Sequence, residues 1–172
     1  MRIVVCVKHV PDMQSERRFE GGRLVRGEDD VLNELDENAI EAAVQLKESE
    51  EDAGREAEVV ALTMGPEDAE DSLMRALQMG ADRAYIVSDE FLEGSDVITT
   101  ASVLSVAIAK IAQECGPVDL VLTGMASLDA MTSMLPAALA AKAHMPLLGL
   151  ARSLSVEDGA VTIERAVDGY TE

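Results

Sequence analysis

Short apolar runs alternate with stretches of helical spacing along the whole chain. Continuous aliphatic runs predict buried strands at 3–7, 58–63, 83–87 and 118–123. Between and after them, apolar residues at helical spacing predict helices beginning near Asp36 and over 67–78, 96–113 and 132–143. Two more strands are predicted at 147–156 and 160–167, joined at the turn signal Glu157-Asp158-Gly159. This order predicts an α/β fold: an open, mostly parallel, Rossmann-like sheet with helices on both faces and a C-terminal β-hairpin.

Breaker residues divide these elements. Pro11 ends the first strand, and the polar, glycine-containing stretch 12–30 is predicted as a loop or a loose hairpin. Asn33 or Asp36 is a candidate cap for the first helix. The chain shows neither a repeat nor an internal linker, so residues 1–172 are expected to form a single domain.

Composition narrows the class of partner. The chain has 48% hydrophobic but only 2% aromatic residues, so the core must be aliphatic. With 14 Lys and Arg against 33 Asp and Glu, the net charge is −19, which argues against nucleic acid and against an anionic membrane surface. The acidic run 48–52 is either a solvated surface or a face for a basic protein partner.

Cysteine and histidine usage is sparse. Cys6 and Cys115 make no disulfide framework, and His9 and His144 lie too far apart in sequence to indicate a zinc site. The N-terminal apolar run is too short for a signal peptide, and no stretch approaches the ~20 apolar residues of a membrane span. We therefore expect a cytoplasmic protein without metal or membrane insertion.

Candidate chemistry gathers where parallel strands end. Ligands of such sheets bind at the carboxyl ends of the strands near the topological switch point, where several polar or glycine-containing segments should meet: Cys6 to Lys8, Asn33 to Asp36, Met64-Gly65-Pro66 and Gly124 to Thr132. Backbone N–H groups there would face a phosphate. Alternatively, Gly124 is only a turn and Thr132 only a helix cap. Lys8 could neutralise a phosphate or simply mark the strand end. The nearby methionines could line an adenine slot or fill the core.

The standard catalytic and phosphate motifs are missing from the sequence. It contains no G-x-G-x-x-G, no G-x-x-x-x-G-K-[ST] and no G-x-S-x-G. With two histidines, the inventory of general acids and bases is small. The pattern therefore favours a binding protein over a catalyst.

Five blocks, in order along the chain, resemble the electron-transfer flavoprotein β subunit family. The opening M-R-I-V-V-C-V-K-H-V-P-D at 1–12 is similar to that family's I-V-V-x-V-K-x-V-P-D. The stretch N-E-L-D-E-N-A-I-E-A-A at 33–43 resembles its N-x-x-D/C-E-x-A-x-E-x-A. M-G-P at 64–66, R-A-L-Q-M-G-A-D-R-A at 75–84 and D-L-V-L-T-G at 119–124, followed by Asp129, match three further blocks.

The resemblance implies a non-catalytic carrier subunit. It would pair with an α subunit that carries FAD, and the pair would pass electrons from flavin dehydrogenases to a quinone reductase or another respiratory acceptor. The β subunit would bury AMP, or a second FAD in members that bifurcate electrons. Carried over by position, the nucleotide contacts would come from Cys6, Asn33, Glu34, Leu35, Asp36, Met64, Gly124, Asp129 and Thr132.

Two departures from the family pattern change the expectation. Many members read G-K-Q-A-I-D-G-D-T-G-Q-V-G where this chain reads G-M-A-S-L-D-A-M-T-S-M-L-P, so backbone contacts survive while several polar side chains are lost. The block I-E-R-A-V-D-G-Y-T-E at 163–172 resembles only the first half of a longer signature. The chain is therefore expected to lack the C-terminal arm that recognises dehydrogenases.

Two other functions stay open at this point. One is a stand-alone adenine-nucleotide sensor of the stress-protein type, which would form a homodimer and bind ATP or AMP reversibly. The other is an ATP-using hydrolase or transferase, which would need a phosphate-gripping loop where this chain has methionines.

Overall fold

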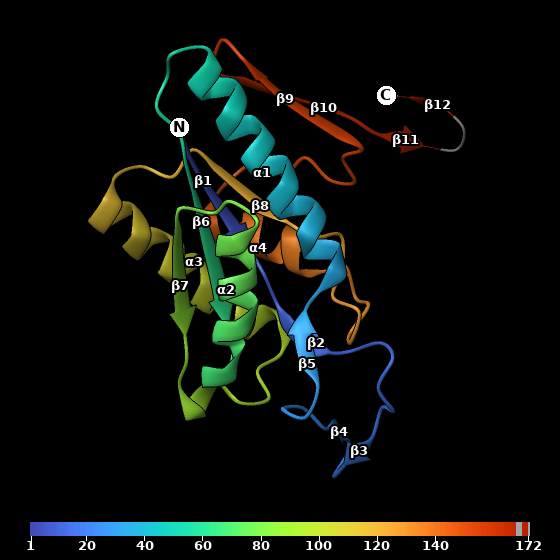
Figure 1. Ribbon diagram of the computed structural model, residues 1–172. Coiled ribbons are helices and arrows are strands. Elements are labelled where there is room, and N and C mark those ends of the chain that lie inside the picture. The colour runs from blue at the N-terminus through green and yellow to red at the C-terminus, as the bar shows by residue number, and fades with distance from the viewer. Residues whose placement is uncertain (168–169, 172) are drawn as a thin grey trace.

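A four-stranded parallel sheet forms the centre of the computed structural model, which describes residues 1–167 and 170–171 (Figure 1). Its strands are β1 (Arg2–Cys6), β6 (Glu58–Met64), β7 (Arg83–Val87) and β8 (Leu120–Thr123), in the order β7-β6-β1-β8. The chain moves outward from β1 to β7 and then returns to the other side of β1 with β8. The topological switch point therefore lies between β1 and β8, and the predicted parallel sheet is confirmed.

Helices cover both faces of the sheet, as predicted. One face carries α1 (Glu34–Asp52) and α2 (Glu70–Gln78), the latter preceded by the 3₁₀ turn η1 (Glu67–Ala69). The other face carries α3 (Val97–Cys115) and α4 (Leu135–Ala143). Successive strand residues point to opposite faces, so Ile3 and Val5 pack toward α1 while Val4 and Cys6 pack toward α3.

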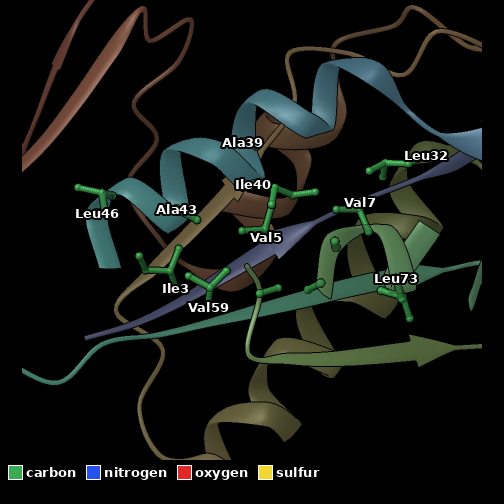
Figure 2. Close-up of a cluster of buried hydrophobic side chains, with 13 residues drawn as sticks. Ile3, Val5, Val7, Leu32, Ala39, Ile40, Ala43, Leu46, Val59 and Leu73 are labelled. Carbon is green, nitrogen blue, oxygen red and sulfur yellow. The ribbon is translucent and has the colours of Figure 1, made fainter. Parts of the chain in front are cut away.

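The first face holds a purely aliphatic cluster (Figure 2). Ile40 and Ala43 of α1 meet Ile3 and Val5 of β1, and all four are fully buried. Full burial of each larger side chain contributes roughly 1.5–3 kcal/mol. This cluster fixes the start of α1 relative to the end of β1, which is the edge where the candidate site lies.

The starts of two helices differ from the sequence-based expectation. Asn33 stands at the cap position of α1, but its side chain makes no capping hydrogen bond. The prediction that α4 begins near Thr132, and the alternative of Thr132 as its cap, are wrong, because the cap position is Met134. Met131 and Ser133 have φ values of 50° and 51°, and such left-handed residues cannot belong to a helix.

The polar stretch after β1 forms two small antiparallel pairs. Strand β2 (His9–Pro11) pairs with β5 (Asp30–Leu32), and between them β3 (Phe19–Glu20) pairs with β4 (Arg23–Leu24). We call residues 12–30 the arm. In Figure 1 the arm extends beyond the carboxyl ends of the parallel strands. The loose-hairpin alternative of the sequence prediction is thus the one the structure adopts.

The C-terminal region adds antiparallel strands outside the central sheet. Strand β9 (Ser153–Glu157) pairs with β10 (Ala160–Glu164), and β11 (Ala166–Val167) pairs with β12 (Tyr170–Thr171). Asp158 and Gly159 form the turn of the first hairpin, with φ values of 50° and 75° as a type I′ turn requires. The predicted hairpin is confirmed, although β9 begins at Ser153 rather than 147 and the second predicted strand is interrupted after Glu164.

Helix α3 has the length and apolar composition of a membrane span, whereas the sequence analysis expected no stretch of that kind. Length and composition alone are weak evidence, since a helix of a protein core passes the same test. Asp96 caps this helix by accepting a 2.7 Å hydrogen bond from the Thr99 N–H. Its buried residues pack against the second face of the sheet: Ala101, Leu104, Ile108 and Ile111.

Candidate functional site at the switch point

A single loop covers the carboxyl ends of β1 and β8. Residues 124–134, which we call the switch-point loop, connect β8 to α4 across the edge where ligands of parallel sheets bind. The segment that follows β1 and the start of α1 both contact this loop. The structure therefore brings together Asn33, Asp36, Gly124 and Asp129, four residues that sequence analysis placed at one site.

Asn33 ties the switch-point loop to the start of α1. Its side chain is fully buried, and its Nδ2 donates to the carbonyl oxygen of Ala126 at 2.9 Å. Its Oδ1 accepts from the N–H of Leu128 at 3.0 Å. The amide thus satisfies one donor and one acceptor of the loop backbone, which explains why it does not cap α1.

Asp36 connects the ends of the two strands. Its Oδ2 accepts a 2.8 Å hydrogen bond from the Lys8 N–H, just after β1, and the Gly124 N–H, just after β8, also bonds to this carboxylate. The residue is only 6% exposed. Burial raises the pKa of Asp36 to about 6, although hydrogen bonds from Asn33, Lys8 and Gly124 and the Lys8 charge act in the opposite direction.

Gly124 allows this close approach. A Cβ at position 124 would lie 2.2 Å from Oδ1 of Asp36 and 2.9 Å from the carbonyl oxygen of Leu35. No side chain fits at those distances. Glycine is therefore required here by packing against the first turn of α1 rather than by an unusual backbone angle.

An ion cluster fixes the middle of the loop. Lys8 Nζ lies 2.8 and 3.0 Å from the two carboxylate oxygens of Asp129 and 3.4 Å from Ser127 Oγ. Arg26 of the arm also pairs with Asp129, whose side chain is only 1% exposed. Burial alone would raise the pKa of Asp129, but Arg26, Lys8 and Ser127 outweigh it and hold that pKa well below its usual range.

Two residues of this cluster escaped the sequence analysis. Arg26 pairs with Asp129, and Arg17 donates to the carbonyl oxygen of Leu128 at 3.0 Å. The only signal in the sequence was a concentration of arginine in a polar stretch of a strongly acidic chain. The arm thus helps to hold the switch-point loop in place, in addition to Lys8 and Asn33.

The end of the loop presents backbone donors. In the first turn of α4 the N–H groups of Leu135 and Ala137 have no partner within the helix, and Pro136 between them has no N–H. Just before them, Ser133 is left-handed and Met134 right-handed, and this alternation turns successive N–H groups toward one side, as in anion-binding nests. Thr132 is exposed beside them. These features fit a phosphate group better than an apolar ligand.

The remaining predicted contact residues lie around this centre. Cys6 is buried on the α3 face, and burial, with a smaller effect of Asp36, raises the pKa of its thiol to about 12. Met64, at the end of β6, packs against the same cluster. Glu34 is exposed and Leu35 half-buried on the first turn of α1. Their contacts with a nucleotide stay predictions.

Two surface hollows lie away from the switch-point loop. One lies within the arm, and the other lies between α3 and α4. Within the described residues, no group of three or more His, Cys, Asp or Glu side chains is arranged to hold a metal ion.

Comparison with known proteins decides the family. The sequence profile of the electron transfer flavoprotein domain matches residues 22–172. The chain belongs to the electron transfer flavoprotein domain family. The resemblance drawn from the five sequence blocks is thereby confirmed.

Relatives of this electron transfer flavoprotein domain include proteins named as β subunits. It is 39% identical over 169 residues to the electron transfer flavoprotein subunit beta of Mycobacterium leprae, covering 96% of this chain and 62% of that protein. It is 37% identical to the subunit beta of Megasphaera elsdenii, covering 99% and 63%. It is 36% identical to the caffeyl-CoA reductase-Etf complex subunit CarD of Acetobacterium woodii, covering 99% and 63%. The chain thus spans a little over three fifths of the length of these relatives.

Proposed function

We propose that this chain is the larger part of an electron-transfer flavoprotein β subunit, a carrier that performs no catalysis alone. The family match and the names of the β-subunit relatives support this assignment. The site agrees with it, since its ionisable groups are engaged in holding the loop in place. Lys8 and Asp129 neutralise each other, and Asp36 bonds to backbone N–H groups.

The partner in this proposal is an α subunit that carries FAD. The CarD relative is named as a subunit of an Etf complex, which supports a multi-subunit assembly. Electrons would enter from flavin dehydrogenases and leave to a quinone reductase or another respiratory acceptor. The assembly would work in the cytoplasm.

The switch-point loop is the proposed site of AMP, or of the adenine-nucleotide half of a second FAD. A flavin bound there would supply reversible electron acceptance, whereas AMP would only stabilise the fold. The observation that carries this proposal is the alternation of a left-handed Ser133 and a right-handed Met134, which turns the N–H groups of residues 133–135 toward one side, on the same loop that Lys8 anchors through Asp129. The phosphate would lie on those N–H groups, near Lys8 Nζ, whose side chain is 39% exposed.

The adenine and ribose would meet mostly apolar surface. Met125, Met131 and Met134 of the loop are exposed and polarisable, so they can stack against a purine ring. Asp129 is already saturated by Lys8 and Arg26 and is poorly placed to bond a ribose hydroxyl. We therefore expect recognition through the phosphate and the ring rather than through the sugar.

Co-expression with an α subunit tests the proposal. The complex would be purified, its ligands released by heat, and the nucleotides identified and counted by mass spectrometry. FAD alone would support the carrier assignment, and one AMP or a second FAD would identify the β ligand. No association and no flavin would refute it. A homodimer that binds ATP or AMP would then indicate a nucleotide sensor, and ATP turnover would indicate a hydrolase.

A charge-matched pair of variants locates the nucleotide. Lys8→Gln should release AMP or the second FAD from the complex while leaving the FAD of the α subunit in place. Lys110→Gln removes one positive charge from the exposed face of α3 and should release neither. Equal retention of the β nucleotide in both variants would contradict a site at the switch-point loop.

A further inference from the structure

Asp36 lies where two strand ends must be held at a fixed distance. Only four residue pairs join β1 to β8, and the last of them joins Cys6 to Thr123. Beyond that pair the two backbones separate, one toward β2 and the other into the switch-point loop. The Val7 N–H still bonds to Leu62 of β6, and the carboxylate of Asp36 then receives the next N–H of that segment, from Lys8, together with the N–H of Gly124 just after β8.

The geometry makes Asp36 a link between backbones rather than a free ligand. Its carboxylate is buried against Gly124 so closely that a Cβ there would lie 2.2 Å from Oδ1. Lys8 is also the residue whose ammonium pairs with Asp129 farther along the same loop. A shift of Asp36 would therefore move the backbone of Lys8 and the start of the loop together.

We propose that Asp36 is a positioning residue for the nucleotide site: its carboxylate joins the end of β1 to the start of the switch-point loop and thereby sets the loop against Lys8. This inference rests on the proposed nucleotide function, but the link itself exists without a ligand. The sequence analysis expected Asp36 to contact the nucleotide, whereas here Asp36 supports the loop that contacts it.

The charged surroundings of Asp36 give the link a measurable signature. The facing groups are the Lys8 ammonium and the Cys6 thiol from β1, the Asn33 amide from its own turn and the Gly124 N–H from the loop. Burial raises the pKa of Asp36 to about 6, so its charge changes within an accessible pH range. Both amide protons that bond to the carboxylate should sense that change.

The experiment is a pH titration of the ¹⁵N-labelled full chain by NMR, without ligand. The amide resonances of Lys8 and Gly124 should move together, with one midpoint near the pKa of Asp36. Asp36→Asn should abolish this shared movement. Glu48→Gln removes the same charge from an exposed position of α1 and should retain it. Independent titration of the two amides, or persistence of the shared midpoint in Asp36→Asn, would overturn the inference.

Affinity for AMP, measured by calorimetry at pH 7.5, supplies the second readout. Asp36→Ala should weaken binding about tenfold or more, since it removes hydrogen bonds to a charged group that hold the loop. Asp36→Asn keeps one acceptor oxygen and should lie between Asp36→Ala and the natural chain. Binding by Asp36→Ala within twofold of the natural chain would overturn the inference. If Asp36→Ala does not fold, the NMR titration of the natural chain and of Asp36→Asn still tests the inference. Failure of the natural chain to bind either AMP or FAD would refute the nucleotide function, whereas shared titration would still support the link.

Discussion

Substituting Gly124 by alanine tests how tightly β8 is joined to the first turn of α1. The added Cβ would lie 2.2 Å from Oδ1 of Asp36, and 2.9 Å from the carbonyl oxygen of Leu35. Carbon and oxygen atoms need roughly 1 Å more than the first distance. The Leu35 oxygen belongs to the helix backbone, so most of the adjustment must come from Asp36 or from the loop.

The magnitude follows from the bonds that this adjustment breaks. Moving the Asp36 carboxylate by about 1 Å lengthens its 2.8 Å hydrogen bond from the Lys8 N–H beyond bonding distance. Loss of a hydrogen bond to a charged group lowers stability by about 1.5–3 kcal/mol, and overpacking adds about 1–3 kcal/mol. We expect Gly124→Ala to lower the free energy of unfolding by about 3–5 kcal/mol. For a chain of this size, that lowers the Tm by about 6–20 °C.

Urea unfolding followed by circular dichroism at 222 nm measures this change. Gly149→Ala is the matched control, because a Cβ at that position meets no atom within 4 Å and the residue does not have positive φ. The control should stay within about 0.5 kcal/mol of the natural chain. A Gly124→Ala variant as stable as the Gly149→Ala control would refute the close packing. In a double-mutant cycle, Asp36→Ala should recover part of the loss, since it removes the nearer of the two clashes.

Three further predictions concern the same site. Asn33→Ala should lower the free energy of unfolding by about 2–4 kcal/mol in urea titration, since it leaves the part-buried Leu128 N–H and the buried Ala126 carbonyl without their partner. Asn38→Ala, on the exposed side of α1, is the control. Relative to Asp36→Asn, the natural chain should lose about 2–3 kcal/mol of stability as pH rises from about 4 to about 7. The pKa of Asp36 is raised in the folded state, so its protonated carboxyl stabilises the folded state at low pH, and this stabilisation disappears as pH rises through about 6. Equal pH dependence in the two proteins would count against a buried carboxyl. Asp129→Ala should raise the dissociation constant for AMP about tenfold or more by calorimetry, because Lys8 and Arg26 then repel each other beneath the loop; unchanged affinity would show that the loop is held by Asn33 and Asp36 alone.

Most of the central sheet could be predicted from the sequence because its strands have a strong hydrophobic pattern. Val4, Val60 and their neighbours are aliphatic and often β-branched, and they need only local propensity and burial to form strands. The hairpin turn at Asp158-Gly159 was equally readable, since few other dipeptides adopt two positive φ angles. The alternation of these elements then leaves few possible topologies.

The meeting of the candidate segments at one edge of the sheet was predictable, but their contacts were not. The location of this edge follows from topology, because the carboxyl ends of β1 and β8 must meet at the switch point. The role of Asn33 was not predictable, because its partners lie 93 and 95 residues away and its type favours a helix cap. The start of α4 was misplaced because left-handed Met131 and Ser133 oppose their own propensities and depend on tertiary contacts.

Strand alternation also predicts the direction of the Cys6 side chain. Cys6 shares its side of β1 with Val4, so its thiol faces the α3 side rather than the loop. The contributions of Arg17 and Arg26 needed the path of the arm, which no periodic pattern encodes.

Strand β8 is an outer strand of the parallel sheet, and it carries the switch-point loop. Its amides should therefore exchange with solvent faster than those of β1 and β6, which are paired on both sides. Local opening of β8 would release the loop without unfolding the remaining sheet. A nucleotide bound at the loop would suppress that opening. Binding should therefore slow amide exchange in β8, while the exchange rates of β7, at the opposite edge of the sheet, stay unchanged.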